Sequence, residues 1–330
     1  MKLLVIGGGV FLGRAVVAAA LNRGHAVTVF NRGKISANDE ARVTWLRGDR
    51  DDDLAVLRTG EWDAAIDTCG YAPRQVRTLL VALRGRIGHY TFVSTVAAYA
   101  DIGRVGLRET DALAVAAGDD VAIGTPGSYG PLKAGCEAAA LASVGVKTLI
   151  VRPGIIAGPH DPTDRFSFWV TRIAAGGEVL APGEPDAPFQ VIDARDLAAW
   201  IVASANCGLT GVFNAVGPGV PLTFGGALEA CVREVGNNTR LVWVGDQWLA
   251  ARSLTDWANL PLYLPKAAAR TAGFYAINGS KAFEAGLAVR PLRETVADTH
   301  AWLAKREPAV PLKMGWSRET EVEVLAAGRR

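Results

Sequence analysis

Short apolar runs alternate with helix-like stretches over the first 150 residues of the chain. The runs at residues 2–6, 26–30, 42–46, 64–67, 89–94 and 147–151 have the length of buried strands. Between them, residues 12–22, 73–83 and 129–143 carry apolar or alanine-rich positions at helical spacing. Gly24 follows the first of these stretches and Pro73 opens the second, as is typical of helix ends and starts. This alternation predicts an α/β fold of the doubly wound (Rossmann) type, a parallel sheet with helices on both faces.

The alternation loosens beyond residue 152, where glycine, proline and seven of the nine tryptophans lie. Helical patterns remain at residues 193–206, 222–235 and 294–305. We therefore predict a first domain over residues 1–151 and a smaller carboxyl-terminal lobe over residues 152–330. Residues 191–214 are expected to return to the first domain, and residues 307–330 to form a loosely docked tail.

Composition and charge exclude several classes of protein. A 50% hydrophobic content is too high for a disordered chain. The 35 Lys and Arg residues are nearly balanced by 33 Asp and Glu residues and form no basic block, which argues against nucleic-acid or anionic-lipid partners. The longest apolar runs fall short of the ~18 residues of a membrane span, and no signal-peptide pattern opens the chain. Four dispersed cysteines argue against a disulfide framework or metal site and favour a cytoplasmic location.

A glycine-rich turn at Gly7, Gly9 and Gly13 joins the first expected strand to the first helix. Glycine allows the backbone to turn tightly and to approach a pyrophosphate, which would meet the free N–H groups at the helix start. Val10 stands where the usual middle glycine would be. The alternative is a purely structural turn. Dinucleotide binding would make residues 1–151 a dinucleotide-binding domain and residues 152–330 mainly a substrate-binding lobe.

The residues that follow the second strand bear on the type of dinucleotide. A carboxylate there would pair with the ribose 2′-hydroxyl of NAD, but this chain has Asn31 and Arg32, and no acid before Asp39. Arg32 is suited to a 2′-phosphate, which favours NADP(H) over NAD(H). A solvated arginine in a turn is the alternative. After the third strand, Asp49 is placed either to accept from the adenine amine or to cap the next helix.

Tyr129 and Lys133 lie four residues apart, and therefore on one face of an expected helix. A phenol has an ordinary pKa of ~10, and a nearby ammonium would lower it towards neutral pH. The lysine could also hold the nicotinamide ribose. A third group must hold the substrate oxygen, and Thr95 at the end of the fifth strand is the first choice, with Ser94 in reserve. The alternative is a buried tyrosine with an exposed lysine.

Taken in order, these motifs resemble the short-chain dehydrogenase/reductase superfamily in its extended or atypical branch, which contains NAD-dependent epimerases and dehydratases. Tyr99 follows Thr95 by four residues, which in that family implies that Thr95 is the catalytic hydroxyl. Further matching positions are Glu137, Arg152, Pro153, Gly158, Asp193, Asp196 and Asn214. The motifs at residues 30–34, 48–51 and 67–71 are similar to bacterial relatives of the chloroplast stem-loop RNA-binding proteins.

The resemblance implies an NAD(P)-dependent oxidoreductase that transfers hydride between nicotinamide and a hydroxyl or keto carbon of a small metabolite, either a sugar nucleotide or a nucleoside-like compound. Because Val10 departs from the epimerase pattern, a reductase that releases its cofactor is as consistent as an epimerase or dehydratase that retains NAD. A third hypothesis is an RNA-binding or regulatory protein on a dehydrogenase fold. The intact Tyr129 and Lys133 pair favours an enzyme.

The expected site residues fall into three groups. The catalytic set is Tyr129, Lys133 and Thr95. The cofactor contacts are Gly7, Gly9, Val10, Phe11, Leu12, Gly13, Asn31, Arg32, Asp49, Arg50, Cys69, Tyr129, Lys133 and Pro153. The substrate candidates are His160, Arg165, Gln190 and Asp193. The apolar faces of residues 73–83 and 129–143 are consistent with a homodimer, although packing of both helices on the sheet explains the same pattern.

Overall fold

The computed structural model describes residues 1–33, 40–266, 271–306 and 311–328. Asp39 and Lys34, the last residue of the motif at residues 30–34, lie outside these residues. The centre of the fold is a seven-stranded sheet in the order β10-β6-β5-β4-β1-β2-β3, in which every neighbouring pair is parallel. Its strands are β1 (Lys2–Ile6), β2 (Ala26–Asn31), β3 (Val43–Arg47), β4 (Ala64–Asp67), β5 (His89–Val93), β6 (Lys147–Pro153) and β10 (Gly211–Ala215). The predicted doubly wound α/β fold is confirmed.

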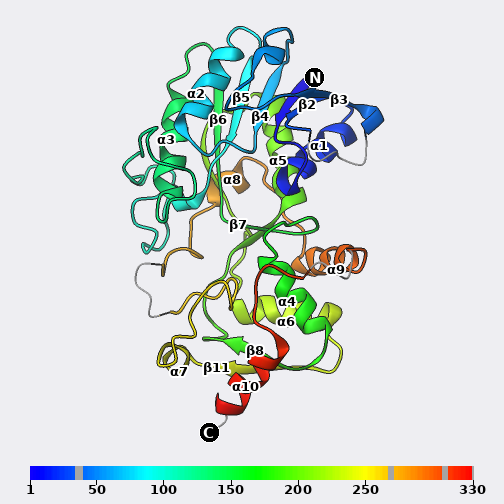
Figure 1. Ribbon diagram of the computed structural model, residues 1–330, viewed down its shortest axis with the longest axis vertical. Helices are drawn as coiled ribbons and strands as arrows, with labels where there is room; N and C mark the ends of the chain where they lie inside the picture. Colours follow the sequence, from blue (N-terminus) through cyan, green and yellow to red (C-terminus); the bar gives the residue numbers. More distant parts are fainter. Residues whose placement is uncertain (34–39, 267–270, 307–310, 329–330) are drawn as a thin grey trace.

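Helices cover both faces of this sheet (Figure 1). On one face, α1 (Phe11–Asn22) packs beside α5 (Ala194–Cys207) over Leu3, Val5 and other buried side chains. On the other face, α2 (Pro73–Ala82) packs beside α3 (Tyr129–Leu141) over Leu4 and Ile6. Alternate residues of β1 therefore belong to two different cores, which explains why the strand is apolar from Leu3 to Ile6. Val76 of α2 is buried in the core beneath the sheet, so packing within the chain explains the apolar face of this helix.

A second lobe lies beyond the carboxyl edge of the sheet (Figure 1). It contains α4 (Arg165–Ala174), α6 (Phe224–Val235), α9 (Leu292–Leu303) and a two-stranded parallel sheet of β8 (Gly177–Pro182) and β11 (Thr239–Val244). Its core is aromatic, with Trp169, Phe189 and Phe224 in edge-to-face contacts. The strands β7 (Ile155–Ala157) and β9 (Val191–Asp193) pair where the chain passes between the two parts.

Two segments of the second half return to the main sheet. The first comprises α5, which packs on α1, and β10, which extends the sheet beside β6. The second was not predicted from the sequence: α8 (Ser280–Glu284) lies beside β10, and Ala282 and Leu287 join the sheet core. The remaining short elements are η1 (Glu40–Arg42), η2 (Ala55–Arg58), η3 (Val96–Ala98) and α7 (Asp246–Ala250).

The expectation of a loosely docked tail was wrong for its described part. Residues Arg318–Gly328 form α10, which is anchored to the second lobe through Glu321. The Glu321 carboxylate is buried and accepts hydrogen bonds from Arg172 Nε (2.5 Å) and from the backbone N–H of Leu180 (2.8 Å). Among the helices described, none combines the length and apolar character needed to cross a bilayer.

Candidate active site

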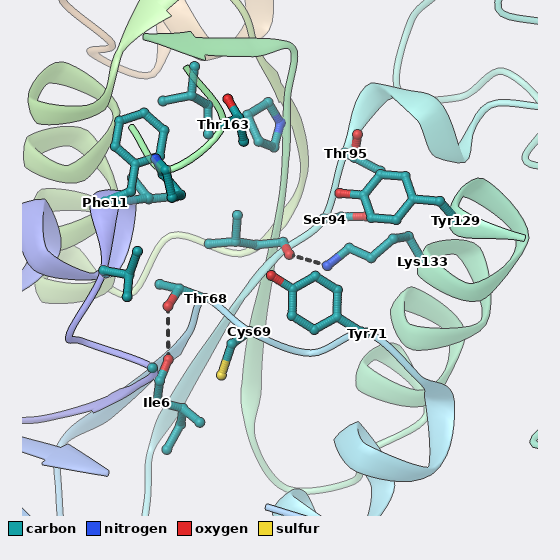
Figure 2. Close-up of a pocket in the computed structure, with 18 of the residues that line it drawn as sticks. Ile6, Phe11, Thr68, Cys69, Tyr71, Ser94, Thr95, Tyr129, Lys133 and Thr163 are labelled. Atoms are coloured by element: carbon teal, nitrogen blue, oxygen red, sulfur yellow. Dashed lines mark hydrogen bonds between the residues drawn. The ribbon is translucent and has the colours of Figure 1, made fainter. Parts of the chain in front are cut away.

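A cavity of about 860 Å³ lies at the carboxyl ends of β1, β4 and β5, between the main sheet and the second lobe (Figure 2). The order of the sheet reverses between β1 and β4, the place where doubly wound sheets bind their ligands. All fourteen residues predicted to contact the cofactor line this cavity, and Thr95 does so as well. Residues as far apart in sequence as Ile6 and Phe274 therefore share one site.

The glycine turn has the tight geometry that the motif predicted. Gly7 has a φ of +88°, and a side chain there would begin 2.7 Å from Cys69 Sγ; a Cβ on Gly13 would lie 2.3 Å from the Gly7 carbonyl oxygen. Val10, in contrast, has an extended backbone (φ −130°, ψ 140°), so this position does not need glycine. The positive φ falls instead on Phe11, at 40°.

The start of α1 is suited to an anion. Its N-cap residue supplies no side-chain hydrogen bond, and its first turn contains no acidic residue. The first N–H groups of the helix and its positive dipole end therefore remain available at the wall of the cavity, since residues 9–13 line it. These residues fit the pyrophosphate of a dinucleotide.

The end predicted to hold the adenosine is rich in arginine. Arg32 is exposed and lines the cavity. Arg50 is instead held in a buried, bidentate ion pair with Asp67 (2.9 Å for each contact), which also accepts from the Tyr90 hydroxyl at 2.9 Å. Burial raises the pKa of Asp67, but the charge and hydrogen bonds of Arg50 outweigh that effect, and the pKa falls below its ordinary value. The charge of Arg50 is therefore neutralised within the protein.

Thr95 and Tyr129 meet because two short segments approach closely. Thr95 caps η3, where its Oγ1 accepts from the Ala97 N–H at 3.1 Å. Tyr129 begins α3, lines the cavity and is 50% exposed. A Cβ on the next residue, Gly130, would lie 2.2 Å from the Ala97 carbonyl oxygen, so glycine is needed for α3 to pack this near η3. Figure 2 shows the phenol of Tyr129 beside Ser94 and Thr95.

Ser94, the reserve candidate, is committed elsewhere. Its hydroxyl donates to Glu137 Oε1 at 2.5 Å. Glu137 also forms a buried bidentate ion pair with Arg152, whose guanidinium donates to the Tyr99 hydroxyl at 3.0 Å. This buried network joins the residue that follows β5 to α3 and β6. The motif residues Glu137 and Arg152, whose roles the sequence left open, are therefore part of the structural support of the site. Thr95 remains the hydroxyl available to a ligand.

Lys133 is more deeply buried than the sequence suggested. Its Nζ donates to the carbonyl oxygens of Gly70 (2.8 Å) and Val93 (2.7 Å), and it lies 4.2 Å from the centre of the Phe92 ring. Burial lowers the pKa of Lys133 to about 8. The ammonium makes two of the three hydrogen bonds it can donate, so one donor remains for a ligand hydroxyl.

The expected lowering of the Tyr129 pKa by Lys133 is not found. Burial raises the pKa of the Tyr129 phenol above its ordinary value, while a hydrogen bond from Thr95 and the charge of Arg165 oppose the rise. Lys133 contributes little because its ammonium is held beneath the phenol by two backbone carbonyls. Tyr129 is therefore a protonated phenol at neutral pH.

Of the four substrate candidates, Arg165 alone is among the residues that line the cavity. Gln190 is used in two hydrogen bonds with the backbone of Ile277, and Asp193 is buried at the start of α5, where it pairs with Arg195. His160 packs against Trp302 at 5.3 Å between ring centres. These three side chains serve packing and capping.

The second lobe supplies lining residues that sequence reasoning missed. They are Ile156, Pro162, Thr163, Trp257 and Phe274. Thr163 follows the Gly158-Pro159 motif closely and could have been suspected from it. Trp257 and Phe274 lie in irregular segments that carried no such signal. Within the described ranges, no group of three His, Cys, Asp or Glu side chains could hold a metal ion.

Two characterised proteins are similar to this chain in sequence. No protein-family profile matches the chain. The chloroplast stem-loop binding protein of 41 kDa b from Arabidopsis thaliana is 27% identical over 255 residues, which are 71% of this chain and 63% of that protein. The 2-alkyl-3-oxoalkanoate reductase of Stenotrophomonas maltophilia is 29% identical over 180 residues, 49% of this chain and 52% of that protein. The chain thus matches less than two thirds of the length of either relative.

Solved structures match over nearly the whole chain. The UDP-N-acetylglucosamine 4-epimerase of Bacillus cereus superposes with a TM-score of 0.68 at 18% identity, covering 94% of this chain and 99% of that one. The Bordetella bronchiseptica enzyme WbmH in complex with NAD+ gives 0.68 at 14% identity, covering 92% and 98%. This chain has the fold of the extended short-chain dehydrogenases. The resemblance predicted from the sequence motifs is confirmed at the level of the fold.

Proposed function

We propose that this protein is an NAD(P)-dependent oxidoreductase that interconverts a hydroxyl and a keto group on a small metabolite. One observation carries the proposal: Thr95 and Tyr129 present two hydroxyl groups side by side on the wall of the cavity that also contains the uncapped start of α1. The same cavity can therefore accept a dinucleotide at one end and bring a substrate oxygen to the phenol at the other. Solved neighbours with this fold were crystallised with NAD or with NAD and UDP.

The chain's own residues would act on the substrate oxygen. A bound nicotinamide supplies the hydride. The Thr95 hydroxyl orients the oxygen, and the Tyr129 phenol donates a proton to it as the carbonyl is reduced. The Tyr129 phenol carries its proton at neutral pH, as this direction requires, because burial raises its pKa above the ordinary value. Lys133 would hold a cofactor hydroxyl with its remaining donor.

The central test replaces Tyr129 by phenylalanine, which removes only the hydroxyl. Consumption of NADPH would be followed with a panel of carbonyl compounds that includes a 3-oxoalkanoate and a UDP-4-ketosugar. We expect kcat to fall by about 10²–10⁴-fold, the usual contribution of a positioned acid or base, while the Kd for NADP+ stays within about twofold. A Tyr129→Phe variant with an unchanged kcat would remove the phenol from the mechanism.

We further propose that NADP(H) is preferred over NAD(H). The support is Arg32, an exposed cation on the cavity wall after β2, in a region that has no carboxylate at the strand end. Arg32→Ala should lower the affinity for NADPH by about 10–100-fold, the value of a charge-assisted contact, and the affinity for NADH by much less. Equal losses for both cofactors would refute the assignment.

An epimerase or dehydratase with retained NAD is the second candidate, favoured by the solved neighbours that are named as 4-epimerases. Such an enzyme keeps its cofactor through a turnover, whereas a reductase exchanges it. Mass spectrometry of the native protein distinguishes the two. Retained dinucleotide with no net NADPH consumption would favour the epimerase, and a cofactor-free protein that consumes NADPH would favour the reductase.

A further inference from the structure

The part of the cavity beyond Thr95 and Tyr129 is mainly apolar. Its lining includes Val96, Ile123, Ile156, Pro162, Trp257 and Phe274. Among these walls, the second lobe contributes the hydroxyl of Thr163 and the charge of Arg165. Figure 2 shows Thr163 across the cavity from Thr95 and Tyr129. A charged side chain in such surroundings is costly unless it has a partner, so the environment of Arg165 is informative.

Arg165 is held in place by a directed chain of hydrogen bonds. Its Nε donates to Thr163 Oγ1 at 3.0 Å. The Thr163 hydroxyl, which has a single proton, donates that proton to Asp161 Oδ1 at 2.7 Å. Asp161 is 1% exposed and also accepts from the Thr163 backbone N–H at 2.9 Å. The hydrogen bonds from Arg165 to Thr163 and from Thr163 to Asp161 fix the Nε edge of the guanidinium. Its two terminal amino groups remain for another acceptor.

Within residues 1–33, 40–266, 271–306 and 311–328, no carboxylate forms an ion pair with those amino groups. Among the described residues, none of the ion pairs includes Arg165. The neighbouring acid, Asp164, is used by Arg306 at 2.7 Å and by the backbone N–H of Lys313. The Arg165 charge nevertheless acts on the Tyr129 phenol, because it opposes the rise that burial causes in the pKa of that phenol. A half-buried and oriented cation that has no ion-pair partner in the described part of the chain therefore lines the cavity in which a substrate would react.

We propose that Arg165 binds a carboxylate of the substrate, and that the substrate is an amphipathic keto or hydroxy acid whose apolar part lies against Ile156, Trp257 and Phe274. This inference rests on the proposed hydride transfer at Tyr129. A planar guanidinium pairs well with a carboxylate through two parallel hydrogen bonds. A nucleoside diphosphate is less well matched, because its several charges and polar base would face one cation and apolar walls. Thr163 and Asp161 are positioning residues.

The reaction balances without any further reactant. In the reductive direction, hydride from the reduced nicotinamide forms a new C–H bond at the carbonyl carbon, and the nicotinamide is oxidised. The electron pair of the carbonyl π bond moves to oxygen, which takes the proton of the Tyr129 phenol. Water then restores that proton. The carboxylate on Arg165 is unchanged and serves to place the carbonyl carbon.

The test measures binding by calorimetry on the full chain, with and without NADP+, using octanoate, 1-octanol and UDP as probes. Octanoate should bind at least tenfold more tightly than 1-octanol, and UDP should not displace it. Arg165→Met should lower the affinity for octanoate at least tenfold and leave NADP+ binding unchanged. Unchanged NADP+ binding also shows that the variant is folded. Arg233→Met, which removes an exposed arginine of α6, is the control for net charge and should leave both unchanged.

A second pair of variants tests the positioning chain. Thr163→Val keeps the shape but removes the acceptor for Arg165 Nε, so octanoate affinity should fall severalfold, less than in Arg165→Met. Thr163→Ser should restore it. Any of three results would overturn the inference. Octanoate could bind equally well to the wild type and to Arg165→Met, the wild type could bind octanoate and 1-octanol equally well, or UDP could displace bound octanoate. If octanoate binds through Arg165 but NADP+ does not bind at all, the proposed function fails and the anion site stands.

Discussion

The buried ion pair between Glu137 and Arg152 provides the sharpest test of what holds the site together. Glu137 is 1% exposed and Arg152 is 3% exposed. The carboxylate accepts from Arg152 Nη2 at 2.7 Å, from Arg152 Nε at 3.0 Å and from Ser94 Oγ at 2.5 Å. Glu137→Gln preserves the shape but removes the charge and turns an amide N–H₂ towards groups that themselves donate.

The expected loss follows from the guanidinium left behind. Removing one partner of a buried pair typically costs about 3–5 kcal/mol, because the other charge stays desolvated and unpaired. That is a large share of the roughly 5–15 kcal/mol by which proteins are stable. Glu137→Gln should therefore lower the free energy of unfolding by about 3–5 kcal/mol. Glu229→Gln, which breaks an exposed pair with Arg233, should cost less than about 1 kcal/mol.

The measurement is urea-induced unfolding followed by far-ultraviolet circular dichroism. A double variant, Glu137→Leu with Arg152→Met, removes both charges and leaves no unpaired charge. Its loss in free energy of unfolding should therefore be smaller than that of Glu137→Leu alone or of Arg152→Met alone. Catalysis should fall as well, since Ser94 precedes Thr95 and Glu137 lies one turn beyond Lys133 on α3. A loss below 1 kcal/mol in Glu137→Gln, or strictly additive single changes, would refute this account.

Three further predictions concern the turn, the lysine and the tail. Gly13→Val should weaken NADP+ at least tenfold, because its Cβ would begin 2.3 Å from the Gly7 carbonyl oxygen; Gly88→Ala, with 3.4 Å to its nearest neighbour, is the matched control, and unaffected titration of Gly13→Val would contradict the pyrophosphate site. With a Lys133 pKa of about 8, kcat/KM should decline as pH rises through 8 and the ammonium becomes neutral; Lys133→Arg should move the decline to higher pH, whereas a flat profile in the wild type would exclude a required charge. Glu321→Gln should release α10 from Arg172 and make the carboxyl-terminal segment sensitive to limited proteolysis, with unchanged cleavage as the contrary result.

Local pattern was sufficient for the first half of the fold. The strand at Ala64–Asp67 and the helix that starts at Tyr129 begin where the sequence predicted. Strands buried on both faces read as short apolar runs, and helices carry their apolar positions at a spacing of 3.6 residues. The pairs β7–β9 and β8–β11 were missed. Their strands are as short as three residues or lie about sixty residues apart, and such pairing depends on distant partners.

The site shows the same division. Sequence motifs brought together the glycine turn, Thr95, Tyr129 and Lys133, and all of them line one cavity. The motif template treated Val10 as an exception, whereas the backbone shows an extended position that accepts valine. Helical spacing placed Lys133 on the same face as Tyr129 but could not show that two carbonyls of β5 and the loop after β4 would hold its ammonium.

The sequence by itself therefore determined the strand–helix alternation, the doubly wound sheet and the identity of the phenol, the amine and the glycine turn, because each is encoded within a few consecutive residues. The tertiary structure alone decided the raised pKa of Tyr129, the burial of Lys133 and Glu137, and the placement of Arg165 on the wall of the cavity that Tyr129 also lines. Those properties depend on desolvation and on distances between segments far apart in the chain, which no local pattern contains.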